Sequence, residues 1–418
     1  MTYAKNRALR KKLALAFGQK GFQNDSLDNQ DIVLKIVQLR YQRAKLLGYK
    51  THAHFVLEER MAKTPENVGT FLEDLLSKAL PAAKKEFEEL ENFAKNLDSI
   101  DQLEKWDSAY YSEKLKQERF NFDDEQLKPY FKLETVIEGA FKVAQKLFGL
   151  QFKQTDTIDT YHKDVMTYKV EDSNQNLVAI FYADFFPRSG KRNGAWMTSF
   201  KSQYVKNNTN ERPHVSIVCN FTKPTATKPS LLTFNEVTTL FHEFGHALHG
   251  MLADTVYPTL SGTSVAWDFV ELPSQIMENW CYEKEALALF AKHYETGDSI
   301  PMELIDKIKA ASTFQQGMQT LRQLSFGLLD MSWHGIDPTE ITNVKQHESA
   351  AFLETQLFPS VAQNCISTAF AHIFQGGYSS GYYSYKWAEV LDADAFEYFK
   401  ENDLFDPEIA AAFKMHIL

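Results

Sequence analysis

F-H-E-F-G-H-A-L-H, residues 241–249, is the stretch from which the fold and the chemistry of this chain are most directly inferred. In an α-helix His242 and His246 lie one turn apart on the same face, so both imidazoles can reach one metal ion. Glu243 lies beside them, where it can act as a base. The H-E-x-x-H spacing therefore predicts a zinc site with a glutamate that activates water, and a chance match in a charged helix is the alternative.

The flanking residues favour a helix. Thr233 and Glu236 form a T-x-x-E capping box, which predicts a helix start near Phe234. The apolar side of that helix comprises Val237, Leu240, Phe241, Phe244, Leu248 and Met251. Gly250 is a plausible end, although a buried helix can continue past it.

A catalytic zinc site uses three protein ligands and keeps one position for water, so one ligand must come from another element. His249 lies seven residues after His242, on the same stripe. A straight helix places these two residues roughly 10 Å apart along its axis at 1.5 Å per residue. We therefore expect His249 to pack beside the site or to support it.

The sequence D-F-V-E-L-P-S-Q-I-M-E-N-W, residues 268–280, is expected to form the next helix. Its polar residues recur at spacings of three and four, which places four of them on one face: Asp268, Glu271, Gln275 and Glu278. A His, His, Glu set with the Glu on the following helix is the arrangement of thermolysin-type peptidases. Position alone leaves Glu271 and Glu278 as alternatives for the third ligand.

These motifs, with S-G-T at residues 261–263 between them, resemble the thimet oligopeptidase, oligopeptidase A and peptidyl-dipeptidase family of zinc peptidases. The resemblance covers nearly the whole chain. In that family the third ligand is the Glu of the F-V-E-x-P-S-Q segment, which corresponds to Glu271. The resemblance thus implies one zinc ion bound by His242, His246 and Glu271.

The composition indicates a large globular protein. With 418 residues, of which 44% are hydrophobic, the chain is too long for one simple domain. We expect a helical region at residues 1–160 and a zinc peptidase catalytic region at residues 161–418. Within the latter, a sheet is expected at about 164–221 and the zinc helices at about 234–285.

Charge and cysteine content limit the possible partners of the protein and the compartment in which it is expected. The net charge of -10 argues against nucleic acid as a partner. Cys219, Cys281 and Cys365 form no C-x-x-C pair, so we expect buried thiols in a reducing compartment. No signal peptide and no membrane-spanning run is recognised. We expect a cytoplasmic monomer that acts on short peptides and binds no membrane.

The predicted sheet consists of β-branched and aromatic runs at residues 165–170, 177–186 and 214–221. We interpret them as a small antiparallel sheet, whose edge can bind an extended peptide beside the zinc helix. The loop before residue 196 resembles the family's strand and loop at this point. Gly194 is expected to let the substrate backbone approach, and Arg188, Lys191 and Arg192 are either substrate contacts or a plain charged loop.

A loop rich in tyrosine and glycine at residues 372–387 is the second informative stretch. Tyrosine hydroxyls can donate to the oxyanion of a tetrahedral intermediate, and the family's corresponding segment supplies such groups. The resemblance implies that Tyr385 and His372 act in catalysis and that Tyr378 and Tyr382 contact substrate, together with Gly194 and Arg188. We expect Tyr383 only to pack.

The sequence therefore predicts a mainly α protein with a zincin-type catalytic region. A small antiparallel β-sheet lies beside the H-E-x-x-H helix, and the helical region forms the wall of a substrate cleft. The expected activity is hydrolysis of short oligopeptides, with removal of C-terminal dipeptides as the alternative. Family members extend further at both ends, so a non-catalytic peptide-binding scaffold is an alternative of another class.

Overall fold

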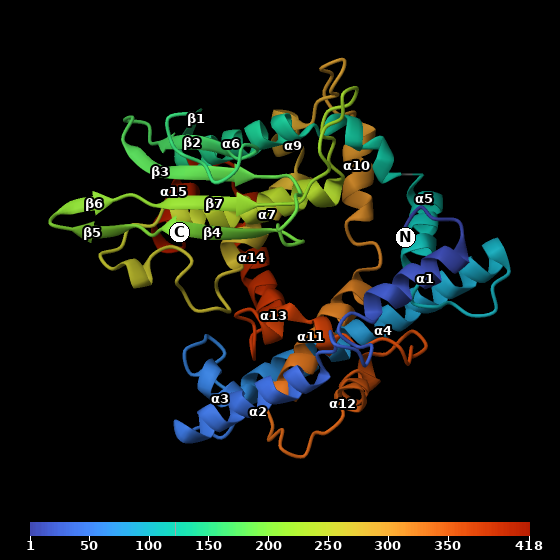
Figure 1. Cartoon of the computed structure of the whole chain (residues 1–418). Coiled ribbons are helices and arrows are strands. Elements are labelled where there is room, and N and C mark those ends of the chain that lie inside the picture. The colour runs from blue at the N-terminus through green and yellow to red at the C-terminus, as the bar shows by residue number, and fades with distance from the viewer. Residues whose placement is uncertain (122) are drawn as a thin grey trace. The chain divides into compact units, whose positions relative to one another are not determined.

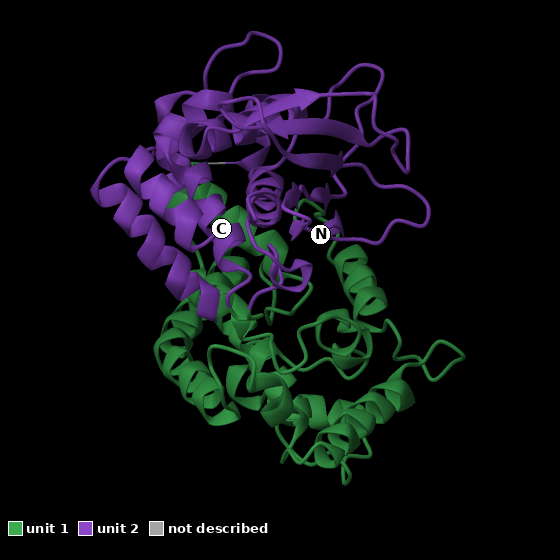
Figure 2. Cartoon of the chain, turned by 90° about the vertical axis from the view of Figure 1, so that its left-hand side faces the viewer, with its two compact units in different colours: residues 1–122, 266–268, 310–386 green, residues 123–265, 269–309, 387–418 purple. Residues whose placement is uncertain are grey.

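The computed structural model describes residues 1–121 and 123–418, which form two compact units built from interleaved segments (Figure 2). Unit 1 comprises Met1–Phe122, Ala266–Asp268 and Ala310–Lys386. Unit 2 comprises Asp123–Val265, Phe269–Lys309 and Trp387–Leu418. The predicted division of the sequence at residue 160 stays a prediction.

Unit 1 is helical. Its helices are α1 (Arg7–Gly18), α2 (Gln30–Leu46), α3 (His52–Leu57), α4 (Pro65–Asp98), α5 (Ser108–Phe120), α11 (Gln316–His334), α12 (Val344–Ala351) and α13 (Ala371–Phe374). The long helix α4 begins at Pro65, and the Thr64 side chain caps its N-terminus. This helix packs along α11. Gly317 allows this close approach, because a Cβ there would lie 2.8 Å from the Ala83 backbone nitrogen.

Unit 2 contains the strands. They are β1 (Gln151–Gln154), β2 (Met166–Glu171), β3 (Leu177–Asp184), β4 (Trp196–Lys201), β5 (Tyr204–Lys206), β6 (Thr209–Glu211) and β7 (His214–Val218). Its helices are α6 (Leu133–Phe148), α7 (Phe234–Met251), α8 (Leu272–Asn279), α9 (Lys284–Phe290), α10 (Met302–Ala311), α14 (Ser384–Glu401) and α15 (Pro407–His416). The last residues of α10 and the first residues of α14 are assigned to unit 1.

The main sheet has the strand order β1-β2-β3-β7-β4, and β5 and β6 form a separate hairpin (Figure 1). The predicted sheet is confirmed, but it is mixed rather than antiparallel, because β3 and β7 run parallel. The chain between Asp184 and His214 is longer than the dozen or so residues that a parallel crossover requires. Strand β4 lies at the edge and is paired antiparallel with β7.

Helix α7 packs against this sheet (Figure 1). The predicted capping box is present, since the Thr233 side chain accepts from Glu236 and the Glu236 side chain accepts from Thr233. The Phe244 ring lies 6.0 Å from that of Phe181 on β3. The helix ends at Met251, one residue after Gly250. A Cβ at Gly250 would lie 2.6 Å from the end of the Met197 side chain on β4 and 3.1 Å from Val215 on β7, so α7 approaches the sheet closely at this point.

The remaining expectations from composition concern cysteines and membranes. Cys219, Cys281 and Cys365 are buried and free, as expected. Among the described residues, no helix combines the length and the apolar character needed to cross a bilayer.

Candidate metal centre

Three side chains of unit 2 converge on one point. His242 and His246 come from α7, and Glu271 immediately precedes α8. Their ligand atoms all lie within 4.8 Å of one another. Glu271 Oε2 lies 3.3 Å from His242 Nε2 and 3.2 Å from His246 Nε2. Two imidazole nitrogens and one carboxylate oxygen are a donor set that suits a catalytic zinc ion.

The close packing of α7 on α8 brings Glu271 to the histidines. Gly245 lies between His242 and His246 on α7, and a Cβ there would be 2.2 Å from the carbonyl oxygen of Pro273. Any other residue at position 245 would push the helices apart. Ser274 Oγ lies 2.8 Å from the Glu271 carbonyl oxygen and 3.0 Å from Glu271 Oε2, so its single proton can be donated to either acceptor. Gly245, which occupies an unspecified position of the H-E-x-x-H motif, therefore has a structural role in the site.

Glu278, the other carboxylate that helical spacing left open, takes a different position. Its Oε1 lies 2.7 Å from His242 Nδ1, the ring nitrogen on the side away from Glu271. A proton on Nδ1 donates to this carboxylate and leaves the lone pair of Nε2 available for a metal. The helix expected from residue 268 begins only at Leu272, so Glu271 lies just before α8 and Glu278 within it. The two carboxylates contact opposite nitrogens of the His242 ring.

Burial and ion pairing set the charges of this cluster in opposite directions. Burial alone would lower the pKa of His242, but the hydrogen bonds to Glu271 and Glu278 outweigh it and raise that pKa well above its usual value. Burial alone would raise the pKa of Glu271, but His242 and His246 hold it well below its usual value. Without a metal these contacts favour an ionised Glu271 and a charged His242, so a metal ion would have to replace the proton on His242 Nε2.

Glu243 is buried beside these residues and has an unused oxygen. Its side chain is 5% exposed, and Oε2 has no hydrogen-bond partner among the described residues. Burial raises the pKa of Glu243, and Glu271 and Glu278 add to the rise, while His242 and His246 oppose it. A buried carboxylate with a raised pKa and a vacant acceptor is well suited to take up a proton.

His249 is not part of the cluster, as helical geometry predicts. It is buried, and burial lowers its pKa to about 4, so the ring is neutral. Its ring packs edge-on against Phe269, with centroids 6.5 Å apart. His249 therefore packs behind the site.

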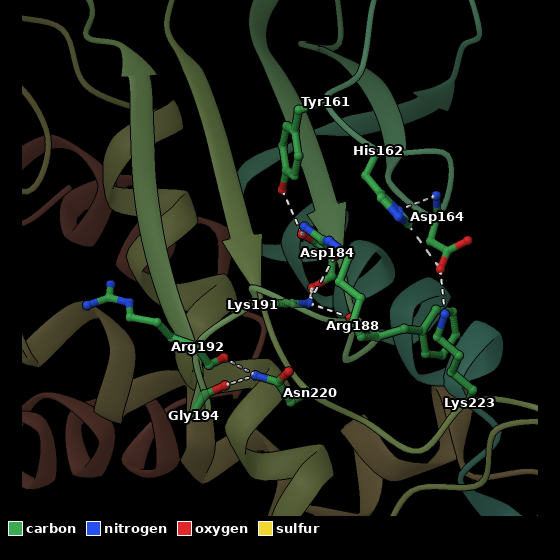
Figure 3. Close-up of polar contacts among 11 residues, drawn as sticks. Tyr161, His162, Asp164, Asp184, Arg188, Lys191, Arg192, Gly194, Asn220 and Lys223 are labelled. Atoms are coloured by element: carbon green, nitrogen blue, oxygen red, sulfur yellow. Dashed lines mark hydrogen bonds and ion pairs between the residues drawn. The ribbon is translucent and has the colours of Figure 1, made fainter. Parts of the chain in front are cut away.

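The loop between β3 and β4 is held by a buried carboxylate that the sequence analysis did not single out (Figure 3). Arg188 donates to both oxygens of Asp184 at 2.8 Å. Lys191 Nζ reaches Asp184 Oδ1 at 2.9 Å, and the Tyr161 hydroxyl donates to Oδ2 at 2.9 Å. Burial would raise the pKa of Asp184, but these donors lower it. Arg188 as a substrate contact stays a prediction, and its guanidinium already binds Asp184.

Gly194 lies at the start of the edge strand with φ +93, a conformation that favours glycine. A Cβ there would meet nothing within 4 Å, so this backbone is open. Asn220 Nδ2 donates to the carbonyl oxygens of Arg192 at 2.9 Å and Gly194 at 2.7 Å (Figure 3). Asn220 was also missed from the sequence, since only the folded chain brings it to this loop.

The tyrosine-rich loop belongs to unit 1, where Asp330 of α11 anchors it. Oδ1 of this buried carboxylate accepts the Ser380 N–H at 2.8 Å. Oδ2 accepts the N–H groups of Gly381 at 2.8 Å and Tyr382 at 2.9 Å. His334 Nδ1 lies 2.8 Å from Oδ1. The Asp330 side chain therefore binds three consecutive backbone N–H groups and fixes the conformation of residues 380–382.

The tyrosines of this loop have different surroundings. Tyr378 and Tyr385 stack with centroids 5.0 Å apart, and His372 is exposed. The Tyr382 hydroxyl donates to Gln323 at 3.0 Å, and burial raises its pKa to about 12. Tyr383 is buried and donates to Asp268 at 2.6 Å, which agrees with the packing role expected of it. Asp268 thus serves Tyr383, although it was placed on the face of Glu271.

Comparison with known proteins gives a consistent result. The model of peptidase family M3 matches residues 1–418. Oligopeptidase A of Escherichia coli (strain K12) is 42% identical over all of this chain and 62% of its own length. Oligopeptidase A of Salmonella typhimurium is 41% identical with the same coverage. Dipeptidyl carboxypeptidase of E. coli is 39% identical over 99% of this chain and 61% of its own length. The chain thus spans about three fifths of these relatives.

A solved structure shares the fold. The structure of PZ peptidase A with inhibitor 2 superposes with a TM-score of 0.62 and 16% sequence identity. The match covers 99% of this chain and 63% of that one. The predicted fold class, mainly helical with a small sheet, is confirmed by this likeness.

Proposed function

Because this chain belongs to peptidase family M3, we propose that it hydrolyses peptide bonds of short oligopeptides with one zinc ion held by His242, His246 and Glu271. The convergence of these three ligand atoms beside Glu243 carries the proposal. The names of the relatives, oligopeptidase A and dipeptidyl carboxypeptidase, support peptides as substrates.

The chain's own residues fit such an ion. Glu271 is ionised and lies within hydrogen-bond reach of Ser274, and with the ion bound Glu278 would keep the His242 proton on Nδ1 and leave Nε2 to the metal. Zinc bound there would lower the pKa of a water molecule from about 15.7 toward 7 and polarise the scissile carbonyl. Glu243 accepts the proton of the attacking water on its free Oε2 and returns it to the leaving amine.

The edge strand β4 provides a surface for the peptide backbone. It has β7 on one side in the main sheet, and α7 packs against it. An extended peptide added to the other side binds through main-chain hydrogen bonds that do not depend on side-chain identity. Gly194 leaves the beginning of this edge open. This binding mode suits peptides of varied sequence.

The tyrosine loop supplies further groups in this proposal. By the family resemblance, Tyr385 and His372 act in catalysis, and Tyr378 and Tyr382 contact substrate. The Gln323 bond occupies the Tyr382 hydroxyl, so Tyr385 and Tyr378 are the first residues to test. A cytoplasmic location and a monomeric state stay predictions.

Removal of C-terminal dipeptides is a second candidate, because one of the similar proteins is named dipeptidyl carboxypeptidase. Product analysis by mass spectrometry separates the two modes. If a peptide is cut only as the free acid, and always two residues from its end, the peptidyl-dipeptidase mode is correct. Cleavage of both the free acid and the amide supports the oligopeptidase.

Turnover of a quenched fluorescent peptide with and without a chelator tests the zinc proposal itself. We expect loss of hydrolysis on chelation and recovery with added zinc. Chelator-insensitive hydrolysis would contradict it, and binding without any hydrolysis would favour the scaffold alternative. A His246→Ala protein that still holds one zinc ion per chain would contradict the ligand set.

A further inference from the structure

A buried hydrogen-bond network of unit 1 leads from α2 through α11 to the tyrosine-rich loop. Helices α2 and α11 pack together (Figure 1); α2 carries Arg40, and α11 carries Asp330 and His334. Arg40 Nη1 lies 2.8 Å from His334 Nε2, and His334 Nδ1 lies 2.8 Å from Asp330 Oδ1. Asp330 is 0% exposed and His334 is 1% exposed. The three side chains therefore form one continuous chain of contacts inside unit 1.

The direction of the hydrogen bonds in this network follows from the chemistry of its members. A guanidinium has donors only, so His334 must accept from Arg40 at Nε2. The ring proton of His334 is then on Nδ1 and faces the Asp330 carboxylate. Burial lowers the pKa of Arg40, and the charge of Asp330 opposes this effect. One imidazole thus links a cation to an anion, and replacing any of the three residues breaks the order of donors and acceptors.

The two ends of this network bind the two ends of one loop segment. Arg40 donates from Nη1 and Nη2 to the carbonyl oxygens of residues 373 and 374, at 2.6 Å and 3.1 Å, where α13 ends. Asp330 accepts the backbone N–H groups of residues 380–382 at distances of 2.8, 2.8 and 2.9 Å. Residues 375–379 lie between these two points and include Tyr378. A single network therefore fixes this segment at both of its ends.

Aromatic rings hold the middle of the same segment. A Cβ at Gly377 would lie 2.6 Å from Trp267 Cζ2, so the backbone of the segment lies directly on this ring. The centroid of the Tyr378 ring is 5.4 Å from that of Trp267 and 5.0 Å from that of Tyr385, on which it stacks. A shift at either end of residues 375–379 therefore displaces Tyr378 and, through the stacked rings, Tyr385.

We propose that Arg40, His334 and Asp330 are positioning residues that set the conformation of the tyrosine-rich loop for catalysis. They act through Tyr378 and Tyr385, and the inference rests on the proposed function. The network fixes the backbone when the protein folds, so the loop does not lose this conformational freedom again in each turnover. A hydroxyl aimed at an oxyanion is sensitive to its placement, since a shift of about 1 Å can reduce the rate about 10²-fold.

A double-mutant cycle tests this inference. Asp330→Asn keeps the size of the side chain but replaces one acceptor oxygen by a donor. We expect it to lower kcat about 10²-fold, with one zinc ion per chain and little change in KM. When Tyr378→Phe and Tyr385→Phe are already present, Asp330→Asn is expected to lower kcat by no more than about a further twofold. An equal loss in both backgrounds would overturn the inference, because the effect would not pass through the two hydroxyls.

Variants of Arg40 test the other end of the network and remain informative if Asp330→Asn does not fold. Arg40→Gln removes the charge and the bonds to residues 373 and 374, and we expect a loss of kcat of the same kind. Arg40→Lys keeps the charge and is expected to restore part of kcat. Unchanged kcat in folded, zinc-loaded Arg40→Gln protein would also overturn the inference.

Asp107→Asn is the matched control. Asp107 is also a fully buried carboxylate of unit 1, but its partners Arg7 and Arg10 lie on α1 and not in the tyrosine-rich loop. We expect this variant to lose stability and to keep the kcat of the folded protein. An equal loss of kcat in Asp107→Asn would show that any damage to unit 1 lowers the rate, and it would overturn the inference. Failure of the proposed function shows separately, as absent or chelator-insensitive hydrolysis by the unsubstituted protein.

Discussion

Glu278 Oε1 lies 2.7 Å from Nδ1 of His242, while Glu271 Oε2 lies 3.3 Å from Nε2 of the same ring. One imidazole thus contacts two carboxylates of the α8 segment, one on each nitrogen. The first contact can orient the ring, and the second places a carboxylate oxygen beside the nitrogen that would bind a metal.

Glu278→Ala is expected to weaken zinc binding about 10- to 100-fold, because loss of the partner on Nδ1 frees the tautomer and the ring orientation. Competition with a fluorescent chelator measures the affinity. Glu285→Gln, on the exposed face of α9, serves as the control that removes one carboxylate elsewhere in unit 2. An unchanged zinc affinity in Glu278→Ala would show that the contact does not orient the ligand.

Gly245→Ala is expected to destabilise the protein by about 1–3 kcal/mol, because the added Cβ overlaps the backbone of α8. Zinc affinity should fall with it, since Glu271 moves away from the histidines. Denaturant unfolding measures the first effect. In Gly69→Ala on α4 the new Cβ meets nothing within 4 Å, and we expect no loss of stability there. Equal stability of the two variants would contradict the packing account.

Tyr385→Phe is expected to lower kcat by about 10²–10³ with little change in KM, as for the loss of one oxyanion donor. Tyr383→Phe instead removes the hydroxyl that Asp268 accepts, so it should lower stability while the folded enzyme retains kcat. Steady-state kinetics and thermal unfolding of both variants separate the roles. A normal kcat in Tyr385→Phe would remove this tyrosine from catalysis.

The stability of unit 1 is expected to fall at acidic pH through Asp107. This fully buried carboxylate lies 2.7 Å from Arg7 and 2.9 Å from Arg10. Burial would raise the pKa of Asp107, but the bonds from Arg7 and Arg10 lower it. Because the pKa of Asp107 is lower in the folded than in the unfolded protein, its ionisation stabilises the fold at pH values above the unfolded pKa of about 3.9. This stabilisation is lost as the pH falls through the pKa of the folded state.

Unfolding of Asp107→Asn at several pH values checks this. Near pH 7 we expect the free energy of unfolding of Asp107→Asn to be at least about 1 kcal/mol lower than that of the unsubstituted protein. This difference should shrink below about pH 4. A deficit that stays constant down to pH 2 would show that ionisation of Asp107 contributes nothing.

Local signals in the sequence identified the centre of this site. The capping box, the i, i+4 histidines and the glutamate between them depend only on helical geometry, and α7 forms as expected. Helical spacing could not decide between Glu271 and Glu278, because a helix over residues 268–280 would place both on one face, whereas in the structure α8 begins only at Leu272, after Glu271.

Features that depend on distant parts of the chain were not predictable in this way. The parallel pairing of β3 with β7 requires the path of the intervening chain, which no local pattern encodes. Arg188 binds the buried Asp184, and Asn220 donates to the backbone of Arg192. Asp184 and Asn220 reach this loop only when the sheet has formed.

The central claim is that zinc held by His242, His246 and Glu271 works together with Glu243 as the base. Glu243→Gln keeps the size of this buried side chain but removes its ability to accept the proton. Zinc content by elemental analysis, measured on the same sample as hydrolysis of a quenched short peptide, tests the claim most directly. We predict one zinc ion per chain and a rate reduced by about 10²–10⁴. Hydrolysis at the unsubstituted rate by zinc-loaded Glu243→Gln protein would contradict the account.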